Sequence, residues 1–261
     1  SDYFLTVLVR TQGKREEALK DALLCLSSQT DPDFHVVILA HDAVVENLSM
    51  LQKLVDRQEA SFRDRITIIS VMGGTRATPL NVGIEHIRGE YVSVFDDDDL
   101  LFANWVQVFK AGASESPGTV QRALTAVQHV RPETWPQGSS GYRAVTWPEM
   151  PYPESFELLD HIEVNKSPFM SVAFPAVIFK KLGLRFDEEL TVCEDWDVIL
   201  QSALICGVNS LKELTSIYRM WDGVETSYTK HSEESWRASE NSVKSRLNNK
   251  TNLLPIGALM E

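Results

Sequence analysis

The sequence has 261 residues, of which 43% are hydrophobic and 24% charged, and its 25 basic and 37 acidic side chains give a formal net charge of -12 at pH 7. This composition excludes a disordered chain, and the length fits one α/β domain or one domain with a substantial appendage. Because an acidic surface repels phosphate backbones, we expect no nucleic-acid polymer among the partners.

Signals for a membrane or a secretory route are missing from the sequence. None of the apolar runs approaches the ~20 residues that cross a bilayer, so we expect no transmembrane segment. A basic segment followed by an apolar one is absent at the N-terminus, which argues against a signal peptide. The three cysteines lack metal-ligand spacing and favour a reducing compartment. We therefore predict a cytoplasmic protein and leave open a peripheral contact with the inner face of the membrane.

Strand and helix patterns alternate along the first part of the chain. Apolar runs of strand length cover Phe4–Val9, Val36–Ala40, Ile66–Val71 and Tyr91–Phe95. Between them, apolar positions at helical spacing predict helices over Arg15–Ser28, Val44–Ala60 and Leu80–Ile87, the last with Gly89 near its C-cap. This alternation implies right-handed crossovers and an α/β fold with a mostly parallel central sheet flanked by helices.

The second half is less regular. The patterns predict a helix over Asn104–Ala113, a long strand over Val120–Val130, a strand and helical turn over Ser171–Leu182, a helix over Trp196–Leu204, a strand over Leu211–Tyr218 and a polar helix from Ser232 to about Asn248. The segment Pro132–Pro153 is rich in Pro, Gly, Ser and Trp and predicts a long surface excursion. Its aromatic residues suit stacking on sugar rings or, as we favour for any single one, holding the segment to the core: Trp135, Tyr142, Trp147 and Tyr152.

Polar motifs directly follow the predicted strands of the first half. They are Arg10-Thr11, Asp42, the Gly73–Arg76 loop and Asp96–Asp99. Ligands of open α/β sheets gather at the carboxyl ends of the strands. We therefore expect these four motifs to converge on one edge of the sheet.

The run Asp96–Asp99 carries the clearest chemical signal. Adjacent carboxylates repel one another at a strand end unless a cation neutralises them, and their oxygens suit Mg²⁺ or Mn²⁺. Mg²⁺ commonly combines one or two carboxylates with substrate phosphates, which favours a phosphorylated ligand. The alternative is a solvated acidic turn in which Asp99 caps a helix beginning near Leu101. We favour the metal site because the run follows a buried strand.

Four segments form a series of motifs in consistent order over about residues 4–230. They are VLVRTQGKREEALKDALLCLSSQT (Val7–Thr30), GGTRATPLNVGIEHIRGEYVSVFDDDDL (Gly73–Leu100), CEDWDVIL (Cys193–Leu200) and YRMWDG (Tyr218–Gly223). The series resembles family-2 glycosyltransferases, which have the GT-A fold. In that order, the segments are similar to the family's first strand and helix, its central signature, its acceptor-side Glu-Asp motif and the segment that closes over the donor. Several motifs together are far more specific than any one alone.

The resemblance implies donor contacts for four residues. Thr11 and Asp42 match positions that contact the nucleotide base. Arg76 matches a residue near the donor's phosphates or ribose, and Arg219 matches a position in the donor loop.

Within the aspartate run, the resemblance implies a division of roles. Asp96 and Asp98 match the family's Asp-x-Asp pair, and Asp96 and Asp97 are expected to contact the donor. Asp98 and Asp99 are the expected direct ligands of Mn²⁺ or Mg²⁺.

The acceptor-side motif supplies the expected catalytic residues. Asp195 matches the general base, and Glu194 matches a residue that orients the acceptor or shapes the site. Glycosyl transfer suits a base that is separate from the metal-binding aspartates. The metal offsets charge on the leaving diphosphate, while the other carboxylate takes the acceptor's proton. The alternative role for both acids is to stabilise the start of a helix through its dipole.

Three departures from the family pattern stand out. Trp221 occupies a position where many relatives have His, and His41-Asp42 stands where a paired acidic motif is common. The Gln-x-x-Arg-Trp motif of processive polymerases is absent, which favours transfer of a single sugar.

We predict a GT-A glycosyltransferase domain over residues 1–230, with a nucleotide-sugar-binding half (1–100), an acceptor-side half (101–230) and a C-terminal helical tail (231–261). The predicted enzyme is an inverting, metal-dependent hexosyltransferase of polysaccharide biosynthesis. It moves one sugar from a nucleotide-diphosphate sugar, preferably a UDP-sugar, to a hydroxyl of a saccharide or glycolipid acceptor. Two alternatives stay open, namely a sugar-phosphate nucleotidyltransferase and a non-catalytic nucleotide- or carbohydrate-binding module.

Overall fold

The computed structural model describes residues 2–136, 138, 140–223 and 231–249. The strands are β1 (Tyr3–Thr11), β2 (Phe34–His41), β3 (Ile66–Val71), β4 (Gly89–Asp96), β5 (Leu100–Leu101), β6 (Val120–Thr134), β7 (Ser140–Ala144), β8 (Val172–Pro175) and β9 (Val208–Trp221). The helices are α1 (Glu16–Ser27), α2 (Val45–Asp56), α3 (Ala60–Arg63), α4 (Thr78–Ile84), α5 (Trp105–Glu115), α6 (Leu158–Glu163), α7 (Ala176–Lys180), α8 (Glu194–Cys206) and α10 (Glu233–Asn249), with a short 3-10 helix, η1, at Phe169–Ser171.

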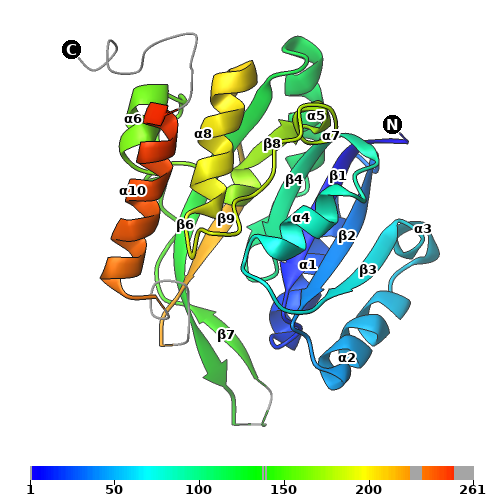
Figure 1. The fold of residues 1–261 in the computed structure, drawn as a ribbon. Helices are drawn as coiled ribbons and strands as arrows, with labels where there is room; N and C mark the ends of the chain where they lie inside the picture. Colours follow the sequence, from blue (N-terminus) through cyan, green and yellow to red (C-terminus); the bar gives the residue numbers. More distant parts are fainter. Residues whose placement is uncertain (1, 137, 139, 224–230, 250–261) are drawn as a thin grey trace.

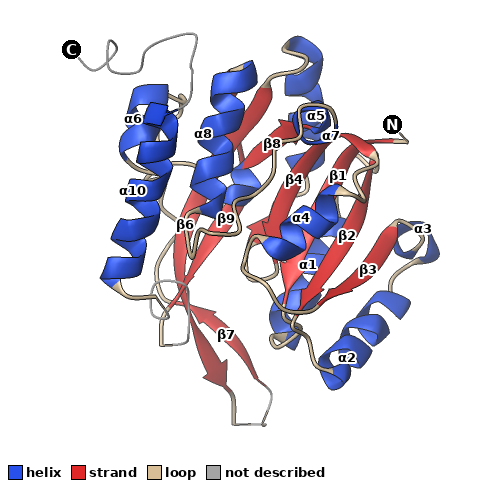
Figure 2. Cartoon of the chain, viewed as in Figure 1, coloured by secondary structure: helices blue, strands red, loops and turns tan. Residues whose placement is uncertain are grey.

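One continuous sheet forms the centre of the molecule, with helices on both of its faces (Figures 1 and 2). Its strand order is β3-β2-β1-β4-β8-β6-β9-β5, and β7 pairs with β6 off this path. Strands β3, β2, β1 and β4 are parallel neighbours, as predicted for the first half of the chain. Strands β6 and β9 are also parallel, whereas the pairings of β5, β7 and β8 are antiparallel. The predicted α/β fold is therefore confirmed, with a sheet that is mixed as a whole.

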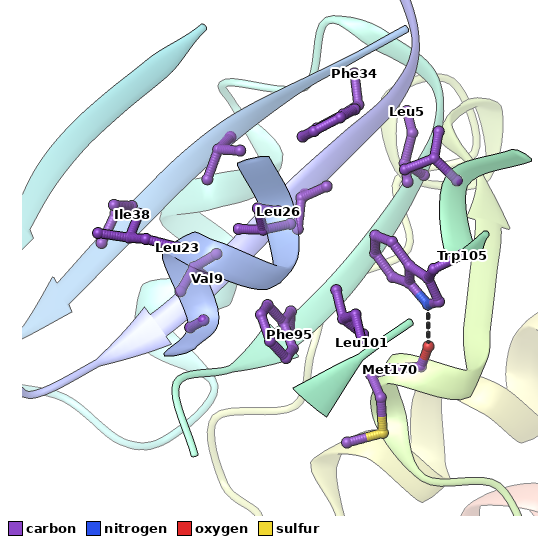
Figure 3. Packing of buried hydrophobic residues seen from close by; sticks show 14 of the residues in the cluster. Leu5, Val9, Leu23, Leu26, Phe34, Ile38, Phe95, Leu101, Trp105 and Met170 are labelled. Atoms are coloured by element: carbon purple, nitrogen blue, oxygen red, sulfur yellow. Dashed lines mark hydrogen bonds between the residues drawn. The ribbon is translucent and has the colours of Figure 1, made fainter. Parts of the chain in front are cut away.

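Two apolar layers pack against opposite faces of the parallel strands. On β1, Val7 and Val9 join the layer that contains α1, α2 and α5, whereas Leu8 joins the layer that contains α4 and α8. Side chains of a strand alternate between its two faces, so an unbroken apolar run indicates a strand buried on both. Figure 3 shows the first layer, where the indole N–H of Trp105 donates to the carbonyl of Met170 at 2.7 Å.

The C-terminal helix α10 packs against α8. Val243 and Leu247 are buried in a cluster with apolar side chains of α8. Arg246 adds an ion pair to the buried Asp197 of α8, with a distance of 3.1 Å between Nη1 and Oδ2. The predicted helix is thus present, while residues 250–261 of the predicted tail lie outside the described residues.

Two features of the irregular half differ from what local composition indicates. The predicted surface excursion over Pro132–Pro153 contains a hairpin, because β6 continues to Thr134 and residues Ser140–Ala144 return as the antiparallel strand β7. The predicted helix over Asn104–Ala113 is confirmed as α5, whereas the alternative helix beginning near Leu101 is absent, since Leu100–Leu101 pairs with β9 as β5. Strand pairing between distant segments overrides local composition in both places.

Gly89 has a different role from the predicted helix cap. Helix α4 ends at Ile84, and Gly89 is the first residue of β4. A Cβ atom at Gly89 would lie 2.6 Å from the backbone nitrogen of Thr6 on the neighbouring strand. The glycine therefore permits a close approach of two backbones.

Among the residues that the structure describes, none of the helices has the length and apolar character of a membrane span.

Two neighbouring leucines of α1 test the packing of the first apolar layer. Leu23 is 3% exposed and Leu24 is 63% exposed. Leu23→Ala is expected to lower the free energy of unfolding by about 2–5 kcal/mol through lost burial and a cavity. Leu24→Ala is expected to change it by less than about 0.5 kcal/mol. Urea denaturation measures both values, and equal losses would contradict the packing described.

Candidate active site

The four strand-end motifs meet at the carboxyl edge of the parallel strands. Arg10 at the end of β1 contacts Asp96 at the end of β4 and the carbonyl of Arg76. Asp42 after β2 accepts the backbone N–H of Gly73 at 2.6 Å. The predicted convergence is confirmed.

A pocket opens between this edge and the start of α8, and its lining includes Arg10, Arg76, Asp96, Asp99, Tyr152, Asn165, Glu194, Asp195 and Trp236.

The guanidinium of Arg10 links the two halves of the site. It donates from Nε and Nη2 to the two carboxylate oxygens of Asp96, each at 2.9 Å, and from Nη1 to Glu194 at 2.7 Å. The side chain of Arg10 is 11% exposed and that of Glu194 only 3%. Burial acts to lower the pKa of Arg10, but the two carboxylates raise it above its ordinary value. A planar guanidinium suits this task because its donors match carboxylate geometry.

Glu194 is shared by two arginines. Besides Arg10, Arg76 donates from Nε to the same Glu194 oxygen at 3.0 Å. Burial acts to raise the pKa of Glu194, but the charges of Arg76 and Arg10 lower it to about 2. Glu194 is therefore ionised at neutral pH and holds both arginines at the wall of the pocket. The structure thus brings Arg76 and Glu194 together, although the sequence placed them on the donor and acceptor sides respectively.

The aspartate run alternates between buried and accessible side chains. Asp97 and Asp99 are 3% and 2% exposed, whereas the side chains of Asp96 and Asp98 are 27% and 24% exposed. Asp97 accepts hydrogen bonds from the Thr11 hydroxyl and, at 2.9 Å, from Arg15. Burial raises the pKa of Asp97 to about 6 despite the charge of Arg15.

The end of the aspartate run contacts β9. The Asp98 carboxylate pairs with Arg15. The backbone carbonyl of Asp98 accepts hydrogen bonds from the Arg219 guanidinium and, at 3.4 Å, from the indole N–H of Trp221. Asp99 Oδ1 accepts the backbone N–H of Arg219 at 2.8 Å. Burial, together with the charge of Asp98, raises the pKa of Asp99 well above its ordinary value. Asp99 does not cap a helix, because Asn104 precedes the first residue of α5.

The Arg219 side chain is fully buried beside this run. Its guanidinium carbon lies 4.4 Å from the ring centre of Tyr142 and 5.3 Å from that of Trp221. It also pairs with Asp21 of α1 at 3.3 Å, and the Tyr142 hydroxyl donates to the same carboxylate. Tyr142 therefore holds the β6–β7 hairpin to the core, while Trp147 of the same segment is 88% exposed.

Asp195 lies in the first turn of α8 and lines the same pocket as Asp96 and Asp99. Cys193 directly before the helix has a positive φ of 69°, and α8 begins at the next residue. Burial and then the charge of Glu194 raise the pKa of Asp195 to about 6. A carboxylate with this pKa is mainly ionised at neutral pH and is well matched to accepting a proton there.

Sequence reasoning did not single out three side chains of this site. Arg10 was noted only as part of a strand-end motif, and the strand-end position was the available signal. Arg15 is only the first residue of a predicted helix in the sequence analysis, and no local pattern there marks it as a partner of the aspartate run. Asn165 lies in the irregular half and is recognised only from its contact with Asp195, at 2.9 Å.

Solved structures with the same arrangement define the class of fold. S. aureus TarS residues 1–349 in complex with UDP-GlcNAc has a TM-score of 0.73 and 17% identity, over 97% of this chain and 69% of that chain. The same TarS fragment in complex with UDP has a TM-score of 0.67 and 17% identity, over 97% of this chain and 68% of that chain. The mannosyltransferase PcManGT from Pyrobaculum calidifontis in complex with GDP-Man and Mn²⁺ has a TM-score of 0.61 and 13% identity, over 100% of this chain and 79% of that chain. At these identities the likeness establishes the fold, which is the predicted GT-A fold.

The family follows from the sequence itself. The pattern of glycosyl transferase family 2 matches residues 6–179, and the chain belongs to this family. A comparison with curated protein sequences gave no match. The protein is thus a glycosyltransferase, as the motifs predicted.

Loss of Arg10 tests the electrostatic balance of the site. Arg10→Gln leaves the buried Glu194 with one arginine fewer, so we expect a loss of about 3–5 kcal/mol in the free energy of unfolding at pH 7. Glu194 has a pKa of about 2 in the folded protein against an ordinary 4.5. Its stabilising contribution is present above pH 4.5 and disappears as the pH falls towards 2, so the deficit of the variant should shrink over that window.

The matched control for Arg10→Gln is Arg237→Gln. Arg237 forms an exposed ion pair with Glu233, and the two side chains are 77% and 90% exposed. Exposed pairs contribute about 0–1 kcal/mol, so little change is expected. Urea denaturation at several pH values gives both results, and equal effects of the two substitutions would contradict a special role for Arg10.

Proposed function

We propose that the protein is an inverting, metal-dependent glycosyltransferase that moves one sugar from a nucleotide-diphosphate sugar to an acceptor hydroxyl. One observation carries this proposal. A single pocket is lined by Asp96 and Asp99 of the aspartate run and by Asp195 of α8. Transfer with inversion needs charge compensation at the leaving diphosphate and a separate base on the opposite face of the sugar. The carboxylates of the aspartate run are proposed for the first task and Asp195 for the second.

The donor is proposed to enter at the sheet edge. Arg76 and Asp96 line the pocket and are its proposed contacts with phosphate and ribose. Thr11, Asp42, Asp97 and Arg219 are also proposed donor-side residues, although the described pocket lining does not include them. A UDP-sugar is the preferred donor, and the acceptor is proposed to be a saccharide or glycolipid. The UDP-GlcNAc complex of TarS supports a uridine donor by analogy alone.

The proposed metal is Mn²⁺ or Mg²⁺, held by Asp98 and Asp99. Both supply the hard oxygen ligands that these ions prefer, and Asp99 lines the pocket. The counter-ion of Asp98 in the structure is Arg15, whose side chain is 40% exposed. Within the described part of the chain, no group of three His, Cys, Asp or Glu side chains is arranged to hold a metal unaided. That fits an ion whose remaining ligands come from the donor's diphosphate. When bound, the ion would offset negative charge on the leaving group.

Asp195 is proposed to act as the general base. Its carboxylate takes the proton of the acceptor hydroxyl while that oxygen forms a bond to the anomeric carbon of the donor. The bond from this carbon to the diphosphate oxygen breaks, and its electron pair leaves with the nucleoside diphosphate. Attack on the face opposite the leaving group inverts the anomeric centre. Glu194 keeps Arg10 and Arg76 in place and is ionised throughout.

The pH dependence of transfer tests the role of Asp195. Because a base must be deprotonated, the rate is expected to rise as the pH increases through about 6, the pKa of Asp195, and to level off above it. Asp195→Asn is expected to reduce the rate by about 10²–10⁴-fold. Hydrolysis of UDP-GlcNAc with Mn²⁺ is the assay, with Asp64→Asn, a change at a 75% exposed carboxylate, as the control. Unchanged hydrolysis in Asp195→Asn would refute the assignment, and tight donor binding without turnover would favour a non-catalytic module.

Metal binding is tested without turnover. UDP with Mn²⁺ is expected to raise the melting temperature of the wild type by more than UDP alone, because ligands of the native state stabilise it. Asp98→Asn is expected to abolish the Mn²⁺-dependent part of this shift. Asp64→Asn, at a 75% exposed side chain of the same type, should retain it. A full Mn²⁺-dependent shift in Asp98→Asn would exclude that residue as a ligand.

A further inference from the structure

A short loop after α6 positions a side chain against the proposed base. Asn165 Nδ2 donates to Asp195 Oδ2 at 2.9 Å, and both residues line the pocket. The other end of the same amide is also engaged, because Asn165 Oδ1 accepts the backbone N–H of Ser167 at 3.0 Å. Turning the amide over would set its oxygen against a carboxylate and its NH₂ against an N–H. The two contacts therefore fix which end of Asn165 faces Asp195.

The loop that carries Asn165 is anchored to buried parts of the fold. The Ser167 hydroxyl lies 2.8 Å from Nε2 of the buried His161. The buried Arg122 of β6 donates to the carbonyl of Lys166 at 3.2 Å, in the middle of the loop. From the other side, the indole of Trp196 in α8 donates to the carbonyl of His161 at 2.5 Å. Asn165 and Asp195 are thus held relative to each other by a chain of contacts through packed elements.

Two cations lie near Asp195. Burial raises its pKa, whereas the charges of Arg10 and Arg76 act to lower it, and each of these arginines donates a hydrogen bond to Glu194, the residue before it. Burial and the charges of Asp195, Glu194 and Glu240 raise the pKa of the neighbouring Cys193 thiol to about 12. The Asp195 carboxylate accepts the backbone N–H of Trp196 and the neutral side-chain amide of Asn165. This side-chain amide stabilises one oxygen without neutralising the charge, which suits a group that must still accept a proton.

We propose that Asn165 is the positioning residue of Asp195. This inference rests on the proposed role of Asp195 as the base. It adds that the amide holds Oδ2 and so fixes the orientation in which the carboxylate meets the acceptor hydroxyl and takes its proton as the acceptor oxygen bonds to the anomeric carbon. Fixing the base in this orientation saves reorganisation when the acceptor arrives.

One substitution separates positioning of the base from support of the loop. Asn165→Asp keeps an oxygen that can accept the Ser167 N–H, so the loop contact survives. It replaces the NH₂ donor with a second oxygen, so the contact with Asp195 becomes repulsive. Asn47→Asp is the matched control, because Asn47 donates from an exposed site to the carbonyl of Gln12, at 3.2 Å.

The decisive readout is the titration of Asp195 in protein labelled with ¹³C at the aspartate carboxyl carbons. The Asp195 signal is assigned by its loss in Asp195→Asn. In Asn165→Asp the midpoint is expected to rise by about one pH unit or more above that of the wild type, because a like charge disfavours ionisation. Asn47→Asp is expected to leave it unchanged. An equal midpoint in Asn165→Asp and the wild type would overturn the proposal.

Turnover separates this inference from the proposed function. In hydrolysis of UDP-GlcNAc with Mn²⁺, Asn165→Asp is expected to lower kcat by on the order of 100-fold with little change in KM for the donor, and to move the acid limb of the pH profile upward. Loss of activity in Asp195→Asn with a wild-type profile in Asn165→Asp would overturn the positioning role and keep the base. Full activity in Asp195→Asn would overturn the base, and the carboxyl titration would still decide whether Asn165 controls its ionisation.

Discussion

The ion pairs of Arg10 with Asp96 and Glu194 are the contacts on which the rest of the site depends. Asp96 ends a strand in the first half of the chain, and Glu194 begins a helix in the second half. Both are acidic, and each is followed by further carboxylates. Without a cation between them, the sheet edge and the start of α8 would repel each other. A single guanidinium with two carboxylate partners turns this repulsion into an attachment, with Glu194 almost fully buried.

This balance gives neighbouring carboxylates different properties. Glu194 accepts hydrogen bonds from two arginines and has a pKa of about 2, while burial and the charge of Glu194 raise the pKa of Asp195 to about 6 despite the same two arginines. Two adjacent acids on one helix can therefore take different roles, one holding the pocket wall and the other proposed as the base. Environment rather than residue type makes the division, as in enzymes where paired acids have separated pKa values. Environment acts in the same way on the aspartate run, where burial raises the pKa of Asp97 and that of Asp99.

The parallel strands and the edge where the site forms could be predicted from the sequence. Apolar runs such as Phe4–Val9 mark strands buried on both faces, and motifs at their ends must meet. The partner of Glu194 could not be predicted, because Arg10 lies 184 residues away and no local pattern joins them. Asn165 was missed for the same reason. The β6–β7 hairpin was hidden because its composition is that of a loop, whereas its structure is decided by pairing between strands.

The proposed reaction requires a nucleotide sugar to bind in the pocket that Asp96, Asp99 and Asp195 line. A crystal structure with UDP and Mn²⁺ tests this most directly. We expect the ion beside Asp98 and Asp99, in contact with the diphosphate, and the opposite side of the pocket open towards Asp195. A nucleotide bound elsewhere on the molecule, or a diphosphate in the pocket with no ion at the aspartate run, would contradict it.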